Sequence, residues 1–103
     1  LPSSPYYGLQ TRICPRGAGA LFTVALKGGY QACVDTVAKL ELFSHVANLG
    51  DTRSLVIHPA STTHSQLTEA ELIKAGAGPN VLRLSIGIED ANDLIADLDT
   101  ALC

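Results

Sequence analysis

Arg83 is the residue whose setting points most directly to chemistry. Leu82, Leu84 and Ile86 alternate around it, and a period of two residues is the signature of a β-strand with two different faces. The apolar set should pack against a helix layer, so that Arg83 projects from the opposite face. A guanidinium held on a rigid strand can bind a carboxylate through two parallel hydrogen bonds. The alternative is a solvated surface arginine, which is the usual setting of this residue type.

No other stretch supplies a complete catalytic apparatus. The sequence has no Gly-x-Ser-x-Gly nucleophile elbow, and its glycine pairs are too sparse for a loop that cradles phosphate. His58 and His64 flank a polar segment, for which a hydrogen-bonded loop is a better explanation than a pair of metal ligands. The histidines and cysteines do not fall at zinc-ligand spacings. Paired carboxylates occur mainly in the last predicted helix, where a solvated face explains them.

The chain carries little charge for its size. Charged residues make up 17% of its 103 residues, whereas about 25% is usual in soluble domains. Because a small domain has a high ratio of surface to volume, this deficit indicates that another domain or subunit covers part of the surface. The net charge of −3 and the scattered basic residues argue against nucleic acid as a partner.

Two further features bear on the compartment. No apolar run is long enough for a transmembrane helix, so no membrane partner is expected. Cys14, Cys33 and Cys103 form no paired motif, which favours reduced thiols and a cytoplasmic protein.

Strand and helix patterns alternate along the chain. The first strand candidate, residues 20–26, is apolar on both faces, which predicts a central, covered strand. Short connections near Gly50 and Gly78 point to an antiparallel or mixed sheet. Together these features predict an α+β two-layer small domain with a mostly antiparallel sheet of about four strands and helices on one face. The other strands are expected near residues 42–45, 54–58 and 81–86, and the helices near residues 6–12, 30–40, 69–75 and 91–102.

Two of the predicted helices carry additional signals. Thr68 and Glu71 have the spacing of a capping box, and Gly76 is expected to end the helix that they begin. In the last helix one apolar stripe should face the sheet, formed by Ala91, Leu94, Ile95, Leu98 and Leu102.

Several short motifs occur in an order and spacing that are typical of one enzyme family. They are Asn48-Leu49-Gly50-Asp51, Ser54-Leu55, His58-Pro59-Ala60-Ser61-Thr62-Thr63-His64, Arg83-Leu84-Ser85-Ile86-Gly87-Ile88-Glu89-Asp90 and Asp93-Leu94-Ile95. In these motifs the chain resembles the C-terminal domain of the Cys/Met-metabolism pyridoxal-phosphate enzymes, the cystathionine γ-synthase-like members of the aspartate aminotransferase fold type. The resemblance runs from about Gly17 to Leu102. It implies that residues 17–103 are the C-terminal small domain and residues 1–16 a linker and short helix from the preceding domain.

Within that family, residues 42–51 together with residues 58–64 are most similar to the O-acetylhomoserine sulfhydrylases. Cystathionine synthases and lyases and methionine γ-lyase typically carry serine where Asn48 stands. Similarity to this branch implies a pyridoxal-phosphate-dependent reaction in which O-acetyl-L-homoserine loses acetate and gains sulfide to give homocysteine. The alternative within the family is a cystathionine γ-synthase or lyase, a methionine γ-lyase or an O-succinylhomoserine sulfhydrylase.

The resemblance also assigns roles to three residues. Arg83 matches the arginine that binds the α-carboxylate of the substrate, which agrees with the argument from the strand. Asn48 would lie beside the same carboxylate, and Thr63 is a secondary candidate for the pocket wall. The Schiff-base lysine, the ring-stacking aromatic residue and the phosphate ligands of the family belong to its large domain.

The lysines of this chain do not replace the missing one. Lys27, Lys39 and Lys74 stand in the wrong sequence contexts, so the chain is expected to be a fragment that alone neither holds pyridoxal 5′-phosphate nor catalyses. Its expected partners are its own large domain and a small amino-acid substrate, in a homo-oligomer that the family implies to be a tetramer. Two other interpretations stay open: a free-standing amino-acid-binding α+β module that uses Arg83, and a purely structural interaction domain.

Overall fold

A computed structural model describes residues 2–17, 19–48 and 50–102 of the chain. The predicted helices and strands are all present, with ends within two residues of the expected ones. A short 3₁₀ helix, η1, is added in the segment expected to be a loop. The elements are α1 (Tyr7–Ile13), β1 (Leu21–Ala25), α2 (Gly29–Lys39), β2 (Ser44–His45), β3 (Leu55–Ile57), η1 (Pro59–Ser61), α3 (Glu69–Lys74), β4 (Val81–Ser85) and α4 (Ala91–Leu102).

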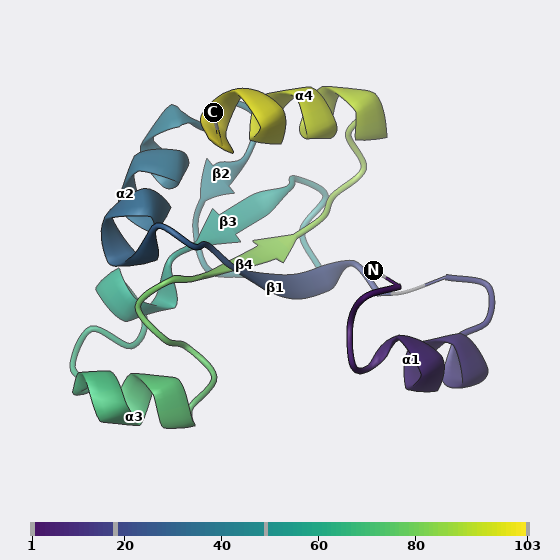
Figure 1. Cartoon of the computed structure of the whole chain (residues 1–103). Coiled ribbons are helices and arrows are strands. Elements are labelled where there is room, and N and C mark those ends of the chain that lie inside the picture. Colours follow the sequence, from purple (N-terminus) through teal and green to yellow (C-terminus); the bar gives the residue numbers. More distant parts are fainter. Residues whose placement is uncertain (1, 18, 49, 103) are drawn as a thin grey trace.

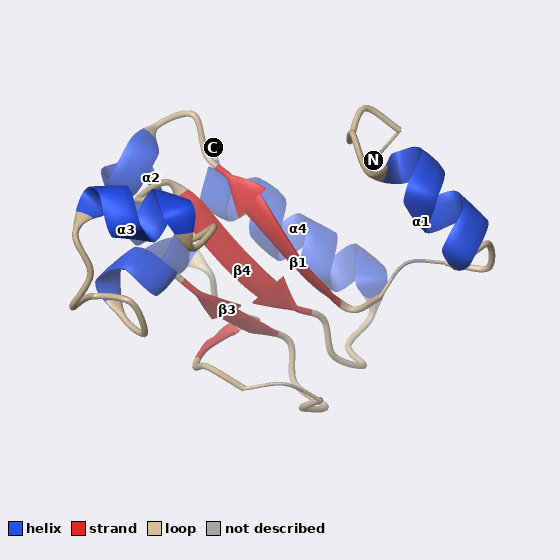
Figure 2. Ribbon diagram, turned by 90° about the horizontal axis from the view of Figure 1, so that it is seen from below, coloured by secondary structure: helices blue, strands red, loops and turns tan. Residues whose placement is uncertain are grey.

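The strands form one mixed sheet in the order β1-β4-β3-β2. Strand β4 pairs antiparallel with β1 on one side and with β3 on the other, whereas the short β2 runs parallel to β3. Helices α2 and α4 lie together on one face of the sheet (Figure 1). Figure 2 looks onto the other face, where β4 lies between its two neighbours. The predicted α+β two-layer fold with a mostly antiparallel sheet is therefore confirmed.

The core lies between the sheet and helices α2 and α4. Leu82 and Leu84 of β4 are each 2% exposed, and they pack in one cluster with Cys33 of α2 and Leu94 of α4. Burial of a leucine side chain stabilises a fold by about 1.5–3 kcal/mol. This packing fixes which way β4 faces, because side chains alternate along a strand, and it directs Arg83 to the opposite face.

Strand β1 differs from its prediction. Residues 20–26 are expected to form a central, covered strand, but β1 is an edge strand and all of its residues are exposed. Phe22 and Val24 pair with Leu84 and Leu82 of β4 and so lie on the helix-facing side, yet they remain 44% and 37% exposed. Apolarity on both faces therefore does not by itself place a strand inside the sheet. In the described part of the chain β1 pairs with β4 alone.

Helix α4 faces the sheet with a narrower stripe than predicted. Leu94 is buried and Leu98 packs partly buried against the core cluster. Ala91, Ile95 and Leu102, in contrast, are exposed. Successive residues turn by about 100° around a helix, so the exposed members lie toward the side of the stripe. The stripe is confirmed at its centre and wrong at its margin.

Asp97 of α4 has a structural role that the sequence does not indicate. Its carboxylate accepts hydrogen bonds from the backbone N–H groups of Glu41, Leu42 and Phe43 at 3.0, 2.8 and 3.4 Å. The connection between α2 and β2 is therefore tied to α4. At this position the expected purely solvated carboxylate is wrong.

Helix α3 begins with the predicted capping box. The Thr68 hydroxyl accepts from the Glu71 N–H at 3.3 Å, and the Glu71 carboxylate accepts from the Thr68 N–H at 2.9 Å. Thr68→Ala removes the first bond and is expected to lower the free energy of unfolding by about 1 kcal/mol. Urea denaturation measures this change. Thr68→Ser keeps the hydroxyl and should match the parent chain, so equal losses in both variants would contradict the role of the cap.

Helix α1 lies to one side of the sheet in both ribbon views (Figures 1 and 2) and buries none of its residues. The short helix expected near the start of the chain is therefore confirmed. The assignment of residues 1–16 to a linker and of residues 17–103 to a small domain stays a prediction. None of the helices in the described residues has the length and apolar character needed to cross a membrane.

Candidate functional site

Arg83 occupies the middle of the central strand. In the register of the sheet it lies between Thr23 of β1 and Ile57 of β3, on the face opposite to α2 and α4. Its side chain is half-buried, and it makes no hydrogen bond or ion pair within the described part of the chain. The orientation expected from the sequence is confirmed. The guanidinium is directed toward the open face, where an external carboxylate can pair with it.

Asn48 and Thr63, the other two residues that the family resemblance assigns to the site, lie in exposed loops. Asn48 follows β2, and its Nδ2 donates a long hydrogen bond to Asp51 Oδ2 at 3.5 Å. The Thr63 hydroxyl lies 2.9 Å from His64 Nδ1. The two side chains thus bond within their own loops. The structure does not join them to Arg83 by hydrogen bonds.

A local ion pair orders the loop that carries Asn48. Arg53 Nη2 lies 3.0 Å from Asp51 Oδ2, and the Arg53 backbone N–H donates to Asp51 Oδ1 at 2.9 Å. The side-chain hydrogen bond from Arg53, followed by the backbone one, lowers the pKa of Asp51 to about 2. The carboxylate next to Asn48 is therefore ionised and paired at neutral pH.

Acidification is expected to loosen this ion pair only below about pH 4. The pKa of Asp51 falls from an ordinary 3.8 to about 2 in the folded chain. Its contribution to stability is therefore complete above the ordinary pKa and is lost as the pH falls through the folded one. Arg53→Ala removes the main cause, so it should raise the pKa of Asp51 part of the way back. NMR titration of the Asp51 carboxyl measures this, and an unchanged pKa in the variant would contradict the assigned cause.

The loop after β3 is organised around a buried histidine. His58 is 1% exposed, and its Nε2 lies 2.8 Å from the Pro79 carbonyl, which can only accept. In a neutral imidazole Nδ1 is then the acceptor, and it lies 3.0 Å from the Ser61 hydroxyl. The Tyr30 ring of α2 packs edge-on at 4.8 Å between centroids. The predicted hydrogen-bonded loop is confirmed, and both ring nitrogens of His58 are satisfied.

Ser54 and Glu89 form a contact to which the sequence analysis assigns no role. Ser54 is fully buried, and its N–H and hydroxyl donate to Glu89 Oε1 and Oε2 at 2.8 and 2.7 Å. The Gly87 N–H donates in turn to the Ser54 hydroxyl at 2.8 Å. The bond from the Ser54 backbone, followed by that from its hydroxyl, lowers the pKa of Glu89. The sequence feature that could have indicated this contact is a serine directly before a buried strand, because a buried polar side chain needs a hydrogen-bond partner.

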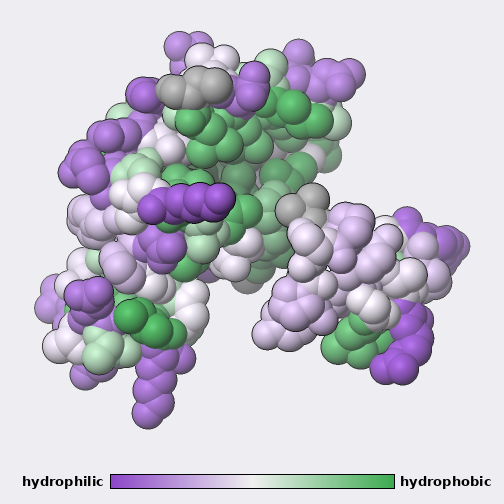
Figure 3. All heavy atoms as spheres, viewed as in Figure 1, coloured by the Kyte–Doolittle hydropathy of each residue, from purple (hydrophilic) through white to green (hydrophobic). Residues whose placement is uncertain are grey.

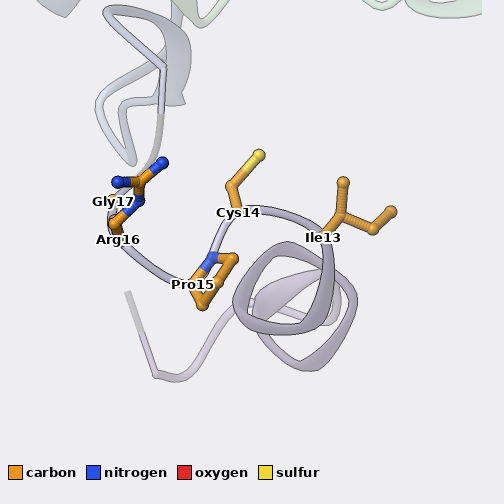
Figure 4. Close-up of a pocket in the computed structure, with 5 residues that line it drawn as sticks. All are labelled: Ile13, Cys14, Pro15, Arg16 and Gly17. Atoms are coloured by element: carbon orange, nitrogen blue, oxygen red, sulfur yellow. The ribbon is translucent and has the colours of Figure 1, made fainter.

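One hollow of the surface lies near the start of the chain. It measures about 420 Å³ and is lined by consecutive residues 13–17, which curl after α1 (Figure 4). Because a single bend of the chain forms it, no side chains from separate elements converge there. It therefore offers no arrangement suited to catalysis.

Two further hollows lie in the body of the fold. One of about 290 Å³ is lined by α2 residues together with His45, His58 and Ser61. The other, of about 160 Å³, is apolar and lies between β1 and α4, with Phe22 and Leu102 in its lining. Figure 3 shows apolar side chains gathered below α4, over this part of the molecule. The three hollows do not include the predicted site residues.

The lysines and the potential metal ligands of the chain are dispersed. Lys27, Lys39 and Lys74 are exposed, and none of them lines the three hollows. Among the described residues, no group of three or more His, Cys, Asp or Glu side chains is placed to hold a metal ion. Among the described residues, the half-buried Arg83 side chain is the candidate for binding an anion.

The chain is 48% identical, over 99% of its length, to O-acetyl-L-homoserine sulfhydrylase 1 of Thermus thermophilus. A crystal structure from Campylobacter jejuni, described as an O-acetylhomoserine (thiol)-lyase with pyridoxyl-lysine phosphate, superposes over 99% of the chain with a TM-score of 0.86 and 47% identity. Cystathionine γ-synthase of Xanthomonas oryzae in complex with cystathionine covers 99% of the chain with a TM-score of 0.82 and 40% identity.

The chain corresponds to only part of these proteins. It spans 24% of the Thermus protein, 24% of the Campylobacter chain and 26% of the Xanthomonas chain. The exposed, dispersed lysines described above do not fit a pyridoxal-phosphate cradle. The family model of the Cys/Met metabolism PLP-dependent enzymes matches residues 1–103, and this chain belongs to that family.

Proposed function

We propose that this chain is the C-terminal part of an O-acetylhomoserine sulfhydrylase, which converts O-acetyl-L-homoserine and sulfide to homocysteine and acetate with pyridoxal phosphate. The names of the Thermus and Campylobacter proteins support this reaction. The observation that supports a part for this chain in the reaction is Arg83, a half-buried residue on the open face of the sheet. In this proposal residues 1–16 lead from a large domain into the small domain formed by residues 17–103.

The share of the reaction that we assign to the chain is recognition of the substrate. An amino acid presents an α-carboxylate, and the planar fork of an arginine matches its two oxygens. Arg83 would bind this group, the Asn48 amide would donate a further hydrogen bond, and Thr63 would contribute to the pocket wall. Because these residues come from separate elements around an open face, the remaining wall of the pocket belongs to another part of the enzyme.

The same proposal assigns the cofactor and its lysine to the large domain of the enzyme. The exposed apolar side chains of β1 support a covered position in a homo-oligomer, which we propose to be a tetramer. The purified 103-residue chain should then neither catalyse nor bind pyridoxal phosphate. Appearance of the absorbance band of lysine-bound cofactor on mixing would contradict this part of the proposal.

A substrate panel tests the proposed reaction. In a full-length enzyme that carries this chain as its C-terminal part, O-acetyl-L-homoserine and sulfide should give homocysteine and acetate. Turnover should be slower with O-succinylhomoserine, and cystathionine and methionine should not be cleaved. The alternative is a cystathionine γ-synthase, since the Xanthomonas enzyme is 40% identical, and preferential use of cysteine over sulfide would select it. Absence of all these reactions would refute both functions.

A further inference from the structure

Ser54 joins three segments of the chain by hydrogen bonds. It ends the loop that carries Asn48 and directly precedes β3. Its carbonyl accepts the Ser44 N–H of β2 at 2.9 Å, while its N–H and hydroxyl donate to the Glu89 carboxylate at 2.8 and 2.7 Å. Glu89 lies in the connection between β4 and α4. A single carboxylate thus ties the Asn48 loop to the end of the strand that carries Arg83.

Close backbone packing makes this tie rigid. The Gly87 N–H donates to the Ser54 hydroxyl at 2.8 Å, and the Ile88 N–H donates to the Thr52 carbonyl at 2.9 Å. A Cβ atom at Gly87 would lie 2.5 Å from the Arg53 carbonyl carbon and 2.7 Å from the Ser54 nitrogen. The absence of a side chain at Gly87 therefore lets the two segments approach closely enough for Glu89 to reach Ser54.

The Asn48 loop depends on its end points for its position. The described residues of this loop, 46–48 and 50–53, lie in no helix or strand. The ion pair of Asp51 with Arg53 lies inside the loop itself. Upstream, Asp97 holds the backbone amides of residues 41–43. Downstream, Glu89 holds Ser54. Arg83 stands on a packed strand, so the spacing between it and Asn48 depends on these anchors.

We propose that Glu89 is a positioning residue: through Ser54 it fixes the Asn48 loop against β4 and so sets the spacing at which Asn48 and Arg83 together bind the α-carboxylate of an amino acid. This inference rests on the proposed function. Glu89 itself does not touch the substrate. Its loss leaves Arg83 in place but releases the loop, so it weakens carboxylate binding more than it slows turnover of the bound substrate.

The test compares Glu89→Ala with the parent in the full-length enzyme that carries this chain. The KM for O-acetyl-L-homoserine should rise about tenfold or more, with kcat within about threefold. Inhibition by L-homoserine should weaken by a similar factor, whereas inhibition by 3-aminopropan-1-ol, which lacks the carboxylate, should not change. Glu89→Gln keeps an oxygen acceptor for Ser54 and should recover most of the affinity. Ser54→Ala, which keeps the backbone bond, should give an intermediate KM.

Asp90→Ala is the matched control for loss of stability. Asp90 is the neighbouring carboxylate, and it caps α4 by accepting from the Asn92 and Asp93 N–H groups at 2.8 and 3.3 Å. This variant should lower Tm without raising KM. If Glu89→Ala and Asp90→Ala raise KM equally, or if Glu89→Ala leaves KM unchanged, the positioning role is wrong. Should Glu89→Ala fail to fold, Ser54→Ala decides by the same comparison.

An Arg83→Lys variant separates this inference from the proposed function. If Arg83→Lys raises KM and Glu89→Ala does not, the carboxylate site stands and the positioning role falls. If Arg83→Lys leaves both KM and the inhibition by L-homoserine unchanged, the proposed carboxylate site is wrong, and the positioning role falls with it.

Discussion

Replacing Arg83 with alanine in the full-length enzyme is expected to lower kcat/KM for O-acetyl-L-homoserine by about 30-fold to several thousandfold. This range corresponds to the roughly 2–5 kcal/mol commonly lost when one partner of a buried, hydrogen-bonded charge pair is removed. The physical reason is that the substrate carboxylate would enter the site without the cation that replaces its hydration shell. Most of the loss should appear in KM, because the carboxylate is bound equally in the ground state and in the transition state.

Two variants make this result specific. Arg83→Lys keeps the charge but loses the planar fork, so it should recover only part of the affinity. Arg12→Ala removes the same charge from an exposed position on α1 and should leave kcat/KM unchanged. Steady-state kinetics with the acetyl ester measure all three variants. If kcat/KM of Arg83→Ala equals that of the parent, Arg83 does not bind the carboxylate.

Gly87→Ala is expected to destabilise the chain by about 3 kcal/mol, the upper end of the usual penalty for an overpacked site. The added Cβ would meet the backbone of residues 52–54, with the Arg53 carbonyl carbon at 2.5 Å. Backbone next to the buried strand β3 cannot yield as a flexible side chain would. The shift should also break the hydrogen bond from the Gly87 N–H to Ser54. Tm should fall by roughly 12–24 °C for a domain of this size.

Gly78→Ala provides the control for a glycine replacement as such. A Cβ there would lie 3.5 Å from Asn80 Oδ1 and 3.7 Å from Ile73 Cγ1, which are ordinary contacts, so stability should change by less than about 0.5 kcal/mol. Urea denaturation followed by circular dichroism compares the two variants. Equal stability of Gly87→Ala and Gly78→Ala would show that the close approach of the two segments does not constrain position 87.

Much of the fold follows from local patterns. The alternation around Arg83 places it on a strand with Leu82 and Leu84 on the opposite face, and the packing of the two leucines confirms this. The spacing of Thr68 and Glu71 predicts a cap that the structure contains. These predictions succeed because strand alternation and helix capping involve residues only a few positions apart.

Predictions of which apolar side chains are buried succeed less well. The apolar character of β1 led to a central position in the prediction, but the strand lies at the edge of the sheet. Ile95 and Leu102 were expected to face the sheet from α4, yet they are 62% and 56% exposed. An apolar side chain indicates that burial of that position is favourable. It does not indicate which segment covers that position.

The sequence by itself determined the helices and strands, the open-face direction of Arg83 and, through ordered motifs, the enzyme family. Only the tertiary structure decided the order of the strands and the exposure of β1. It also decided that Ser54 meets Glu89, a residue 35 positions away in the chain. The physical reason is the separation along the sequence of the residues that interact. Periodic patterns involve near neighbours, whereas a carboxylate reaches a buried serine only after the sheet has brought two distant segments together.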